Sequence, residues 1–337
     1  MKNKKTLIGL SVVLCVLTLV ASQCANKTSA PTAATSTSTP TFTSTATPIS
    51  DSSELVLVPG GTFTQTEETG TNSFSHTVSA FKLGKYEVTY DLWYIVYQWA
   101  IVHSYTFENA GVEGNDGVAG DVTTTAKLEP VTMINWRDVI VWCNAYSEKS
   151  GLTSIYYSDA GYTTPLRDST SGAYGSTTCT ATGCFDNPYV NWTANGYRLP
   201  TEGEWQYAAS YINGTSWTAY NYASGATTDY SSSDTTNVGW YDDNSSLLTH
   251  PVANKRKNGL ELYDMSGNVW ERCWDWAGTY PVGSATDYRG MATGSLRVIR
   301  GGGFDNPNSS MQVGKRQSEG PFSFPLTSIG FRVAKKN

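Results

Sequence analysis

The chain has 337 residues, with 23 basic and 29 acidic side chains and a formal net charge of −6. This acidic balance excludes proteins that bind nucleic acid through a basic patch, because no surplus of Lys or Arg is present to neutralise phosphates. We therefore expect no nucleic-acid partner. The length would allow two domains, but the first part of the chain differs in composition from the rest.

The N-terminus resembles an export signal. Three lysines are followed by an uncharged apolar stretch of fifteen residues, 7–21. Such a stretch is shorter than the roughly 20 residues that span a bilayer, and it suits the apolar region of a signal peptide. It ends in Ala-Ser-Gln-Cys, which is similar to the lipobox of bacterial lipoproteins. We predict a lipoprotein signal peptide over 1–23 and lipidation of Cys24; the alternatives are an ordinary cleaved signal or a short anchor.

Residues 24–53 are predicted to form a tether. They are dominated by Ser and Thr, are punctuated by prolines and carry no charge between Lys27 and Asp51. With almost nothing apolar to bury, they cannot offset the entropy of ordering. Removing 1–23 takes away three lysines and no acid, so the charge falls from −6 to −9. The predicted product is an exported, lipid-anchored protein on the outer cell surface, whose contact with the membrane is the lipid anchor.

Residues 54–337 read as one folded domain. Apolar periodicity and capping residues predict helices at 90–102, 135–151 and 204–210. The first of these is apolar nearly all round, which is typical of a core helix. Short strands are predicted at 61–66, 81–89, 296–302 and 329–334. The segments 104–129 and 153–195 are polar and aperiodic, as insertions are. The pattern predicts an α+β domain with short strands, few helices and a high loop content.

Six cysteines become four if Cys15 leaves with the signal and Cys24 is lipidated. An exported protein can retain disulfides, and four cysteines allow three full pairings, between which the sequence does not decide. Cys179 and Cys184 flank the small residues TATG. We prefer a bridge between these two, with Cys143 and Cys273 as buried free thiols.

Several motifs then carry a family resemblance. They are VPGGTF (58–63), KLGKYEVT (82–89), PVTMINWRDVIVWCNAYSEKSG (130–151), GYRLPTEGEWQYAA (196–209), HPVANKRKNGLELYDMSGNVWERCWDW (250–276), RVIRGG (297–302) and IGFRVA (329–334). The series resembles the sulfatase-modifying-factor family over roughly residues 55–334. It implies the C-type lectin fold of the formylglycine-generating-enzyme type.

Enzymes of that family oxidise a substrate cysteine with a pair of active-site cysteines that can hold copper. Asn306 and Met311 stand at the matching positions, and neither side chain can form the thiolate that this chemistry needs. His76, His103 and His250 lie in settings that favour structural roles. No other catalytic signature is present. We therefore expect a protein that is not an enzyme and binds no copper.

Departures from the family pattern crowd the C-terminal loops, about 272–328, while the flanking motifs keep to it. This distribution resembles the variable proteins of diversity-generating retroelements, in which template adenines are randomised. Asparagine codons randomised at both adenines cannot give Trp, Met, Gln, Lys or Glu, so Met311, Gln312, Lys315, Gln317 and Glu319 are interpreted as fixed. The predicted ligand-binding, variable positions are Arg272, Ala277, Gly303, Phe304, Asp305, Asn306, Ser309, Ser310, Ser318, Gly320, Phe322, Phe324, Leu326 and Ser328. Ordinary drift of surface loops is the alternative.

Phe304, Phe322 and Phe324 fall in predicted loops among small polar residues. Exposed aromatic rings with adaptable polar neighbours are typical of binding surfaces, although such rings can instead fill gaps beneath a loop. We predict a ligand-binding protein whose partner is a protein or glycan on another cell or host surface. The alternatives are an exported sulfatase-modifying-type enzyme or accessory protein acting through an unrecognised site, and a structural envelope protein.

The resemblance also implies structural calcium, because oxygen donors suit a hard cation. One implied set is the Asp264 side chain, the Gly267 and Val269 carbonyls, and Glu271. The alternative for the two acids is loop hydrogen bonding or a partner such as Arg272 or Arg297. A second set, with weaker support, is Asn237, Val238, Asn244 and Ser246.

Overall fold

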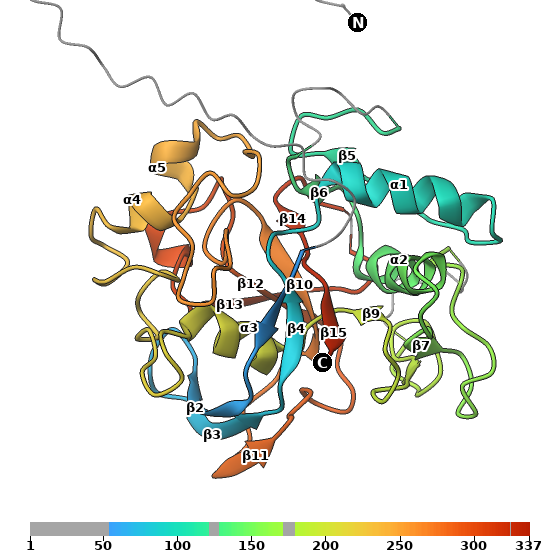
Figure 1. Ribbon diagram of the computed structural model, residues 1–337, viewed down its shortest axis with the longest axis horizontal. Coiled ribbons are helices and arrows are strands. Elements are labelled where there is room, and N and C mark those ends of the chain that lie inside the picture. Colours follow the sequence, from blue (N-terminus) through green and yellow to red (C-terminus); the bar gives the residue numbers. More distant parts are fainter. Residues whose placement is uncertain (1–53, 121–127, 171–178, 324) are drawn as a thin grey trace, which may run out of the picture. The chain divides into compact units, whose positions relative to one another are not determined.

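The computed structural model describes residues 54–120, 128–170, 179–323 and 325–337 (Figure 1). The predicted signal peptide, the tether, Cys24 and Phe324 lie outside these residues, so the boundary at residue 54 stays a prediction. No helix in the described part of the chain has the length and apolar character to cross a bilayer.

The predicted helices form where their capping residues place them. Asn135 and Asp138 make a reciprocal capping box, and so do Thr201 and Glu204. Gly151 follows the second helix with a φ of +69°, which suits glycine. The helices are α1 (Tyr90–Ile101), α2 (Trp136–Lys149), α3 (Glu202–Ser210), α4 (Thr235–Val238) and α5 (Asp242–Ser245), with a 3₁₀ turn at Asn308–Ser310. The two short helices α4 and α5 were not predicted.

The first helix is not the core helix that its apolar sequence predicts. Its buried face consists of Tyr90, Trp93, Val96 and Ala100. Ile95 and Ile101 are exposed on the other side, and Val102 just beyond the helix is 75% exposed. The prediction was wrong because α2 covers only one face of α1, through stacked Trp93 and Trp142 rings 5.5 Å apart.

Short strands make up the remaining regular structure. Two four-stranded sheets have the orders β1-β4-β15-β9 and β13-β12-β10-β14, and β11-β3-β2 form a third sheet. Their bounds are β1 (Leu55–Val58), β2 (Gly61–Thr66), β3 (Ser73–Val78), β4 (Phe81–Gly84), β9 (Tyr197–Arg198), β10 (Trp270–Trp276), β11 (Ser284–Thr286), β12 (Arg297–Arg300), β13 (Arg316–Glu319), β14 (Ile329–Gly330) and β15 (Ala334–Lys336). The predicted strand at 81–89 ends early, at Gly84.

In the described residues of the two predicted insertions, the regular structure consists of short strands. They are β5 (Val112–Glu113), which pairs with β6 (Val131–Thr132), and β7 (Tyr156–Tyr157), which pairs with β8 (Tyr189–Val190). One hydrophobic cluster lies around α1 and α2, and a second lies around α3 with β2 and β12. The α+β architecture with a high loop content is confirmed.

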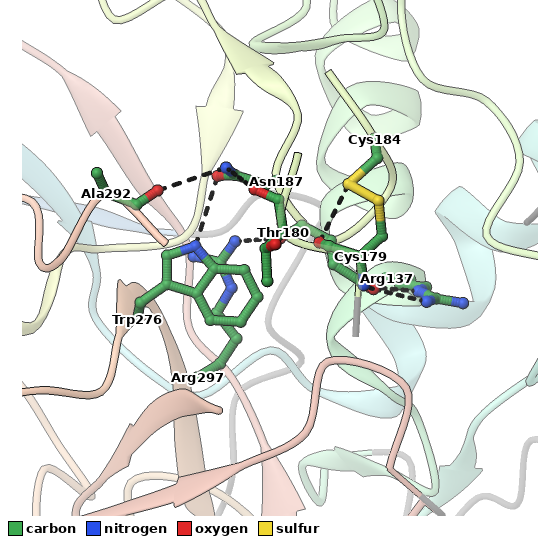
Figure 2. Close-up of a disulfide and its surroundings, with 9 residues drawn as sticks. Arg137, Cys179, Thr180, Cys184, Asn187, Trp276, Ala292 and Arg297 are labelled. Atoms are coloured by element: carbon green, nitrogen blue, oxygen red, sulfur yellow. Dashed lines mark hydrogen bonds and ion pairs between the residues drawn. A yellow bond between two sulfur atoms is a disulfide. The ribbon is translucent and has the colours of Figure 1, made fainter. Parts of the chain in front are cut away.

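The cysteines adopt the preferred arrangement. Cys179 and Cys184 form a disulfide, with their Cα atoms 6.3 Å apart, and Cys143 and Cys273 are buried free thiols. The Cys179 amide donates to Asp186, which accepts from the Arg137 guanidinium of α2 at 2.6 and 2.8 Å. Figure 2 shows the disulfide beside Arg137 and Arg297. The bridged loop is thereby attached to the N-terminal end of α2.

A buried ion pair provides the first test of this fold. Arg332 and Glu271 are both fully buried and pair at 2.6 Å. We expect Arg332→Leu to lower the free energy of unfolding by about 3–5 kcal/mol, because it leaves a buried carboxylate without its cation. Chemical denaturation measures this loss.

Lys257→Leu is the matched control, since Lys257 and Glu261 form an exposed pair; we expect no measurable change. Arg332→Lys keeps the charge and should recover part of the loss if Arg332→Leu does not fold. Equal stabilities for Arg332→Leu and Lys257→Leu would contradict this account.

Candidate ligand-binding site

The first C-terminal loop follows a glycine turn at the end of β12. Gly301 and Gly302 have φ values of +98° and +80°, which favour glycine. A Cβ on Gly302 would lie 2.6 Å from the Ser310 carbonyl oxygen and would also meet the Met311 methyl group. Arg300 holds the strand end through an ion pair with Glu202 at 3.2 Å. The turn therefore requires glycine for both backbone angle and packing.

Asn306 organises the loop at 303–309. Its Oδ1 accepts hydrogen bonds from the Gly303 amide at 3.1 Å and from the Trp270 indole N–H. The Asn306 backbone amide donates to the Gly303 carbonyl at 3.1 Å, and the Asn306 backbone carbonyl accepts from the Asp242 amide of α5 at 3.0 Å. Asp305, between these contacts, is exposed. Figure 1 shows this part of the chain beside α4 and α5.

Phe304 does not contribute an exposed ring. Its side chain is only 4% exposed. The Ser245 hydroxyl donates to its carbonyl at 2.7 Å, and its amide donates to the Asn268 carbonyl at 2.8 Å. The ring fills space under the loop, which was the alternative for these aromatic residues. Gly303, Ser310 and Gly320 are also buried, so they are not contact positions in this conformation.

The second C-terminal loop, 320–328, is partly exposed. Phe322 is half-buried, with the Arg137 guanidinium 5.2 Å from its ring centroid. Leu326 is 41% exposed, and its carbonyl accepts from the Met133 amide at 3.2 Å. The Ser328 carbonyl accepts from the Trp270 amide at 2.8 Å. Both loops are therefore attached to Trp270, the first through its side chain and the second through its backbone.

Arg272 is also not a contact residue, although it was predicted as one. It lies on β10, where every side chain is buried, and it is 0% exposed. Its guanidinium donates to the Ile134 carbonyl at 3.0 Å, and burial lowers its pKa to about 10. Ala277 and Ser318 are partly exposed. The Ala277 amide donates to the Leu296 carbonyl, and Ser318 pairs with Val298 of β12. Both therefore lie at the start of β12, whereas the glycine turn lies at its end.

The predicted positions fall into groups that the sequence could not separate. Those in the two C-terminal loops that remain accessible are Asp305, Asn306, Ser309, Phe322, Leu326 and Ser328. Two contributors were missed by sequence reasoning: Trp270, which anchors both loops, and α5, which supports the first loop. Asp242 and Asn244 are residue types that begin helices, and they were the available signal for α5.

The two positions that the family resemblance aligns with the enzymatic cysteines, Asn306 and Met311, carry no thiol. Asn306 is occupied with the loop contacts above, and Met311 is 0% exposed in a cluster with Val238 and Tyr241. The free thiols Cys143 and Cys273 lie on α2 and β10, and burial raises the pKa of both. These residues do not fit a copper centre of thiolates, because no accessible thiolate stands at this loop.

The first implied calcium set is only partly suited to a cation. The Asp264 Oδ2 accepts from the Ala253 amide at 2.8 Å, whereas its buried Oδ1 has no hydrogen-bond partner among the described residues. Burial raises the pKa of Asp264 to about 6. Glu271 pairs with Arg332, not with Arg272 or Arg297, and also accepts from the Trp205 indole at 2.7 Å. Asp264 fits the role of a ligand, and Glu271 is already engaged.

The weaker set is less suited. Asn244 caps α5, accepting from the Tyr241 amide at 2.9 Å and donating to the Gly239 carbonyl at 2.9 Å. The Asn237 side chain donates to Asp234, Val238 is buried and Ser246 is exposed. Among the described residues, no group of three or more His, Cys, Asp or Glu side chains is gathered as a metal site.

The fold is the C-type lectin fold of the formylglycine-generating-enzyme type, with no thiol at the usual reactive positions. Residues 41–337 match the "Sulfatase-modifying factor enzyme 1-like domain", and the chain belongs to that family. "Chaperone protein LppX" of Paenibacillus barcinonensis is 33% identical over 250 residues, which are 67% of this chain and 72% of that protein. The formylglycine-generating enzyme of Streptomyces coelicolor is 36% identical over 43% of this chain, which spans about half (48%) of that enzyme.

Solved structures agree. "Treponema denticola variable protein 1" superposes with a TM-score of 0.65 and 28% identity, covering 84% of this chain and 95% of that one. CarF superposes with a TM-score of 0.62 over 84% of this chain and 98% of that one, but at 24% identity it supports the fold alone. The predicted resemblance to a variable protein is confirmed at the level of structure.

The Asn306 contacts can be tested directly. We expect Asn306→Ala to lower the free energy of unfolding by about 1–3 kcal/mol, because it leaves the buried Trp270 indole N–H without its acceptor. Urea denaturation measures the change. Asp305→Ala, next to it but exposed, is the control and should leave stability unchanged; similar losses in both variants would show that Asn306 does not organise the loop.

Proposed function

We propose that this chain is a surface-displayed, non-catalytic ligand-binding protein whose C-terminal loops contact the ligand and are diversified by a retroelement. The observation that carries the proposal is the replacement of both reactive cysteine positions, by Asn306 and Met311, within loops whose frame is retained. The similarity to a variable protein over most of both chains supports it.

The loops are built in a way that tolerates variation. The contacts that attach them to Trp270, Met133 and α5 use backbone atoms at Asn306, Leu326 and Ser328, except for the Asn306 side chain. A backbone contact survives a change of side chain, so exposed positions can change without loss of the frame. Asp305, Ser309, Leu326 and Ser328 are the side chains that we expect to meet the ligand.

The ligand is a protein or glycan presented by another cell or host surface. Lipid attached to Cys24 anchors the chain, and residues 24–53 hold the domain away from the membrane. This part of the proposal is supported by the apolar stretch, the lipobox-like sequence and the Ser/Thr/Pro-rich composition of the N-terminal segment.

Two other functions have support from relatives. An exported enzyme or accessory protein of the sulfatase-modifying type is favoured by the similarity to formylglycine-generating enzymes, but neither Asn306 nor Met311 carries the thiol that the chemistry of those enzymes uses. A chaperone is favoured by the similarity to the chaperone of P. barcinonensis. In that case the loops would contact a client protein.

Diversification is tested in the DNA beside the gene. We expect a reverse-transcriptase gene and a near-copy of the 3′ end of this gene, differing mainly at adenines. Sequencing independent isolates should place amino-acid differences at exposed positions such as Asp305 and Leu326, while the codon of the fixed Met311 is the internal control.

A neighbouring region without such a copy would remove the diversification claim and leave a fixed binder. Oxidation of a sulfatase-peptide cysteine by the purified chain would contradict the non-catalytic claim and favour the enzyme.

Calcium is proposed as a structural ion at Asp264, where a cation would satisfy the buried Oδ1 and relieve repulsion from nearby Glu87 and Glu271. We expect millimolar Ca²⁺ to raise Tm by about 2–4 °C, the response of a domain this size to roughly 1 kcal/mol of binding. Asp264→Asn should lose most of the rise. Asp243→Asn, which changes an exposed acid, is the control, and an equal rise in both variants would exclude this site.

A further inference from the structure

A cleft that is separate from the C-terminal loops lies between β3, β4, α3 and the end of β15. Its volume is about 200 Å³, and no described residue from 290 to 335 lines it. Trp192, from the segment interpreted as an insertion, supplies one wall, and Arg289 and Lys336 supply others. The volume is below the roughly 300–1,000 Å³ of sites for drug-sized ligands, so an occupant would be small.

The acids in this cleft already have partners. Both Glu204 carboxylate oxygens accept from the Arg198 guanidinium at 2.7 Å. Asp287 accepts from the amide and the hydroxyl of Ser79 at 2.7 and 2.8 Å. His76 is also engaged, since its Nδ1 meets the Gln65 side chain at 2.7 Å and its Nε2 accepts from the Tyr288 amide at 3.0 Å.

The basic groups do not all have partners. The Arg289 guanidinium lies 4.1 Å from the centroid of the Trp192 ring, and no hydrogen bond or ion pair joins it to another residue in the described ranges. Among the residues that the structure describes, the Lys336 ammonium makes a single long contact, 3.5 Å, to the Thr193 carbonyl. Three basic and two acidic side chains line the cleft, which leaves one positive charge in excess.

We propose that this cleft binds the carboxylate of a small organic molecule. The planar guanidinium of Arg289 presents paired N–H donors that match the two oxygens of a carboxylate, and stacking on Trp192 holds it in one orientation. Lys336 supplies a second positive charge on the same cleft. The single excess charge fits a monoanion, and the indole edge and the Ser79 and Thr201 hydroxyls suit a small polar body attached to it.

The test compares charged and neutral ligands of similar shape on the full chain. Titration calorimetry with glucuronate, glucose, acetate and sulfate distinguishes the sources of affinity. We expect glucuronate and acetate to bind, glucose not to bind, and affinity to fall with added NaCl because the cleft charges are exposed to solvent. Binding of sulfate as tight as that of acetate, or of glucose as tight as that of glucuronate, would overturn the carboxylate assignment.

Variants locate the site. Arg289→Gln should weaken glucuronate binding by about tenfold, since it removes a charge-assisted hydrogen-bond pair. Arg289→Lys keeps the charge but lacks the planar pair of N–H donors, so its affinity for glucuronate should lie between those of the unchanged chain and Arg289→Gln. Arg256→Gln is the matched control, because Arg256 pairs with Asp234 outside the cleft, and it should bind as the unchanged chain does.

Equal binding by Arg289→Gln and Arg256→Gln, at unchanged Tm, would overturn the proposal, as would the absence of carboxylate binding. Neither result bears on the two C-terminal loops at 303–309 and 320–328, because Arg289 lies outside both.

Discussion

The buried pair of Glu271 and Arg332 joins the two four-stranded sheets, and the candidate binding surface depends on it. Glu271 lies on β10 in one sheet, while the Arg332 guanidinium also donates to the Gly84 carbonyl of β4 in the other, at 3.0 Å. Trp270, next to Glu271 in the sequence, begins β10 and is the residue to which both C-terminal loops attach. A position fixed by paired buried charges gives these loops a stable base.

This base separates the loops into positions that can vary and positions that cannot. Where a side chain makes the contact, as Asn306 does with Trp270, its replacement costs a buried hydrogen bond. Where the backbone makes it, as at Ser328, the side chain is free to differ. Asn306 and Met311, which stand where the family resemblance places the enzymatic cysteines, serve here as a loop anchor and a core side chain.

Much of the fold could be predicted, because local signals decide it. The capping boxes at Asn135 and Thr201 each place a helix start, and the motif order places the domain in its family. Burial of individual loop residues could not be predicted in the same way. Phe304 and Leu326 both sit in polar loop sequence, yet the Phe304 side chain is 4% exposed and that of Leu326 is 41% exposed. The difference arises in the tertiary structure, where the Phe304 backbone is hydrogen-bonded to Ser245 and Asn268. Arg272 was misplaced because a departure from the family pattern does not show whether a position is exposed, and every side chain of β10 is buried.

The same limit applies to partners that are distant in sequence. Glu271 was assigned to calcium or to a nearby arginine, and its actual partner lies 61 residues further along the chain. The cleft at Arg289 is a similar case, since Trp192, Arg289 and Lys336 come from three separate segments with no shared motif. The cleft is recognised by its charges. Its acids are hydrogen-bonded to other residues of the chain, whereas Arg289, stacked on Trp192, has no such partner among the described residues. An unbalanced charge on an ordered aromatic support is therefore a sign of a binding site that sequence motifs alone would not reveal.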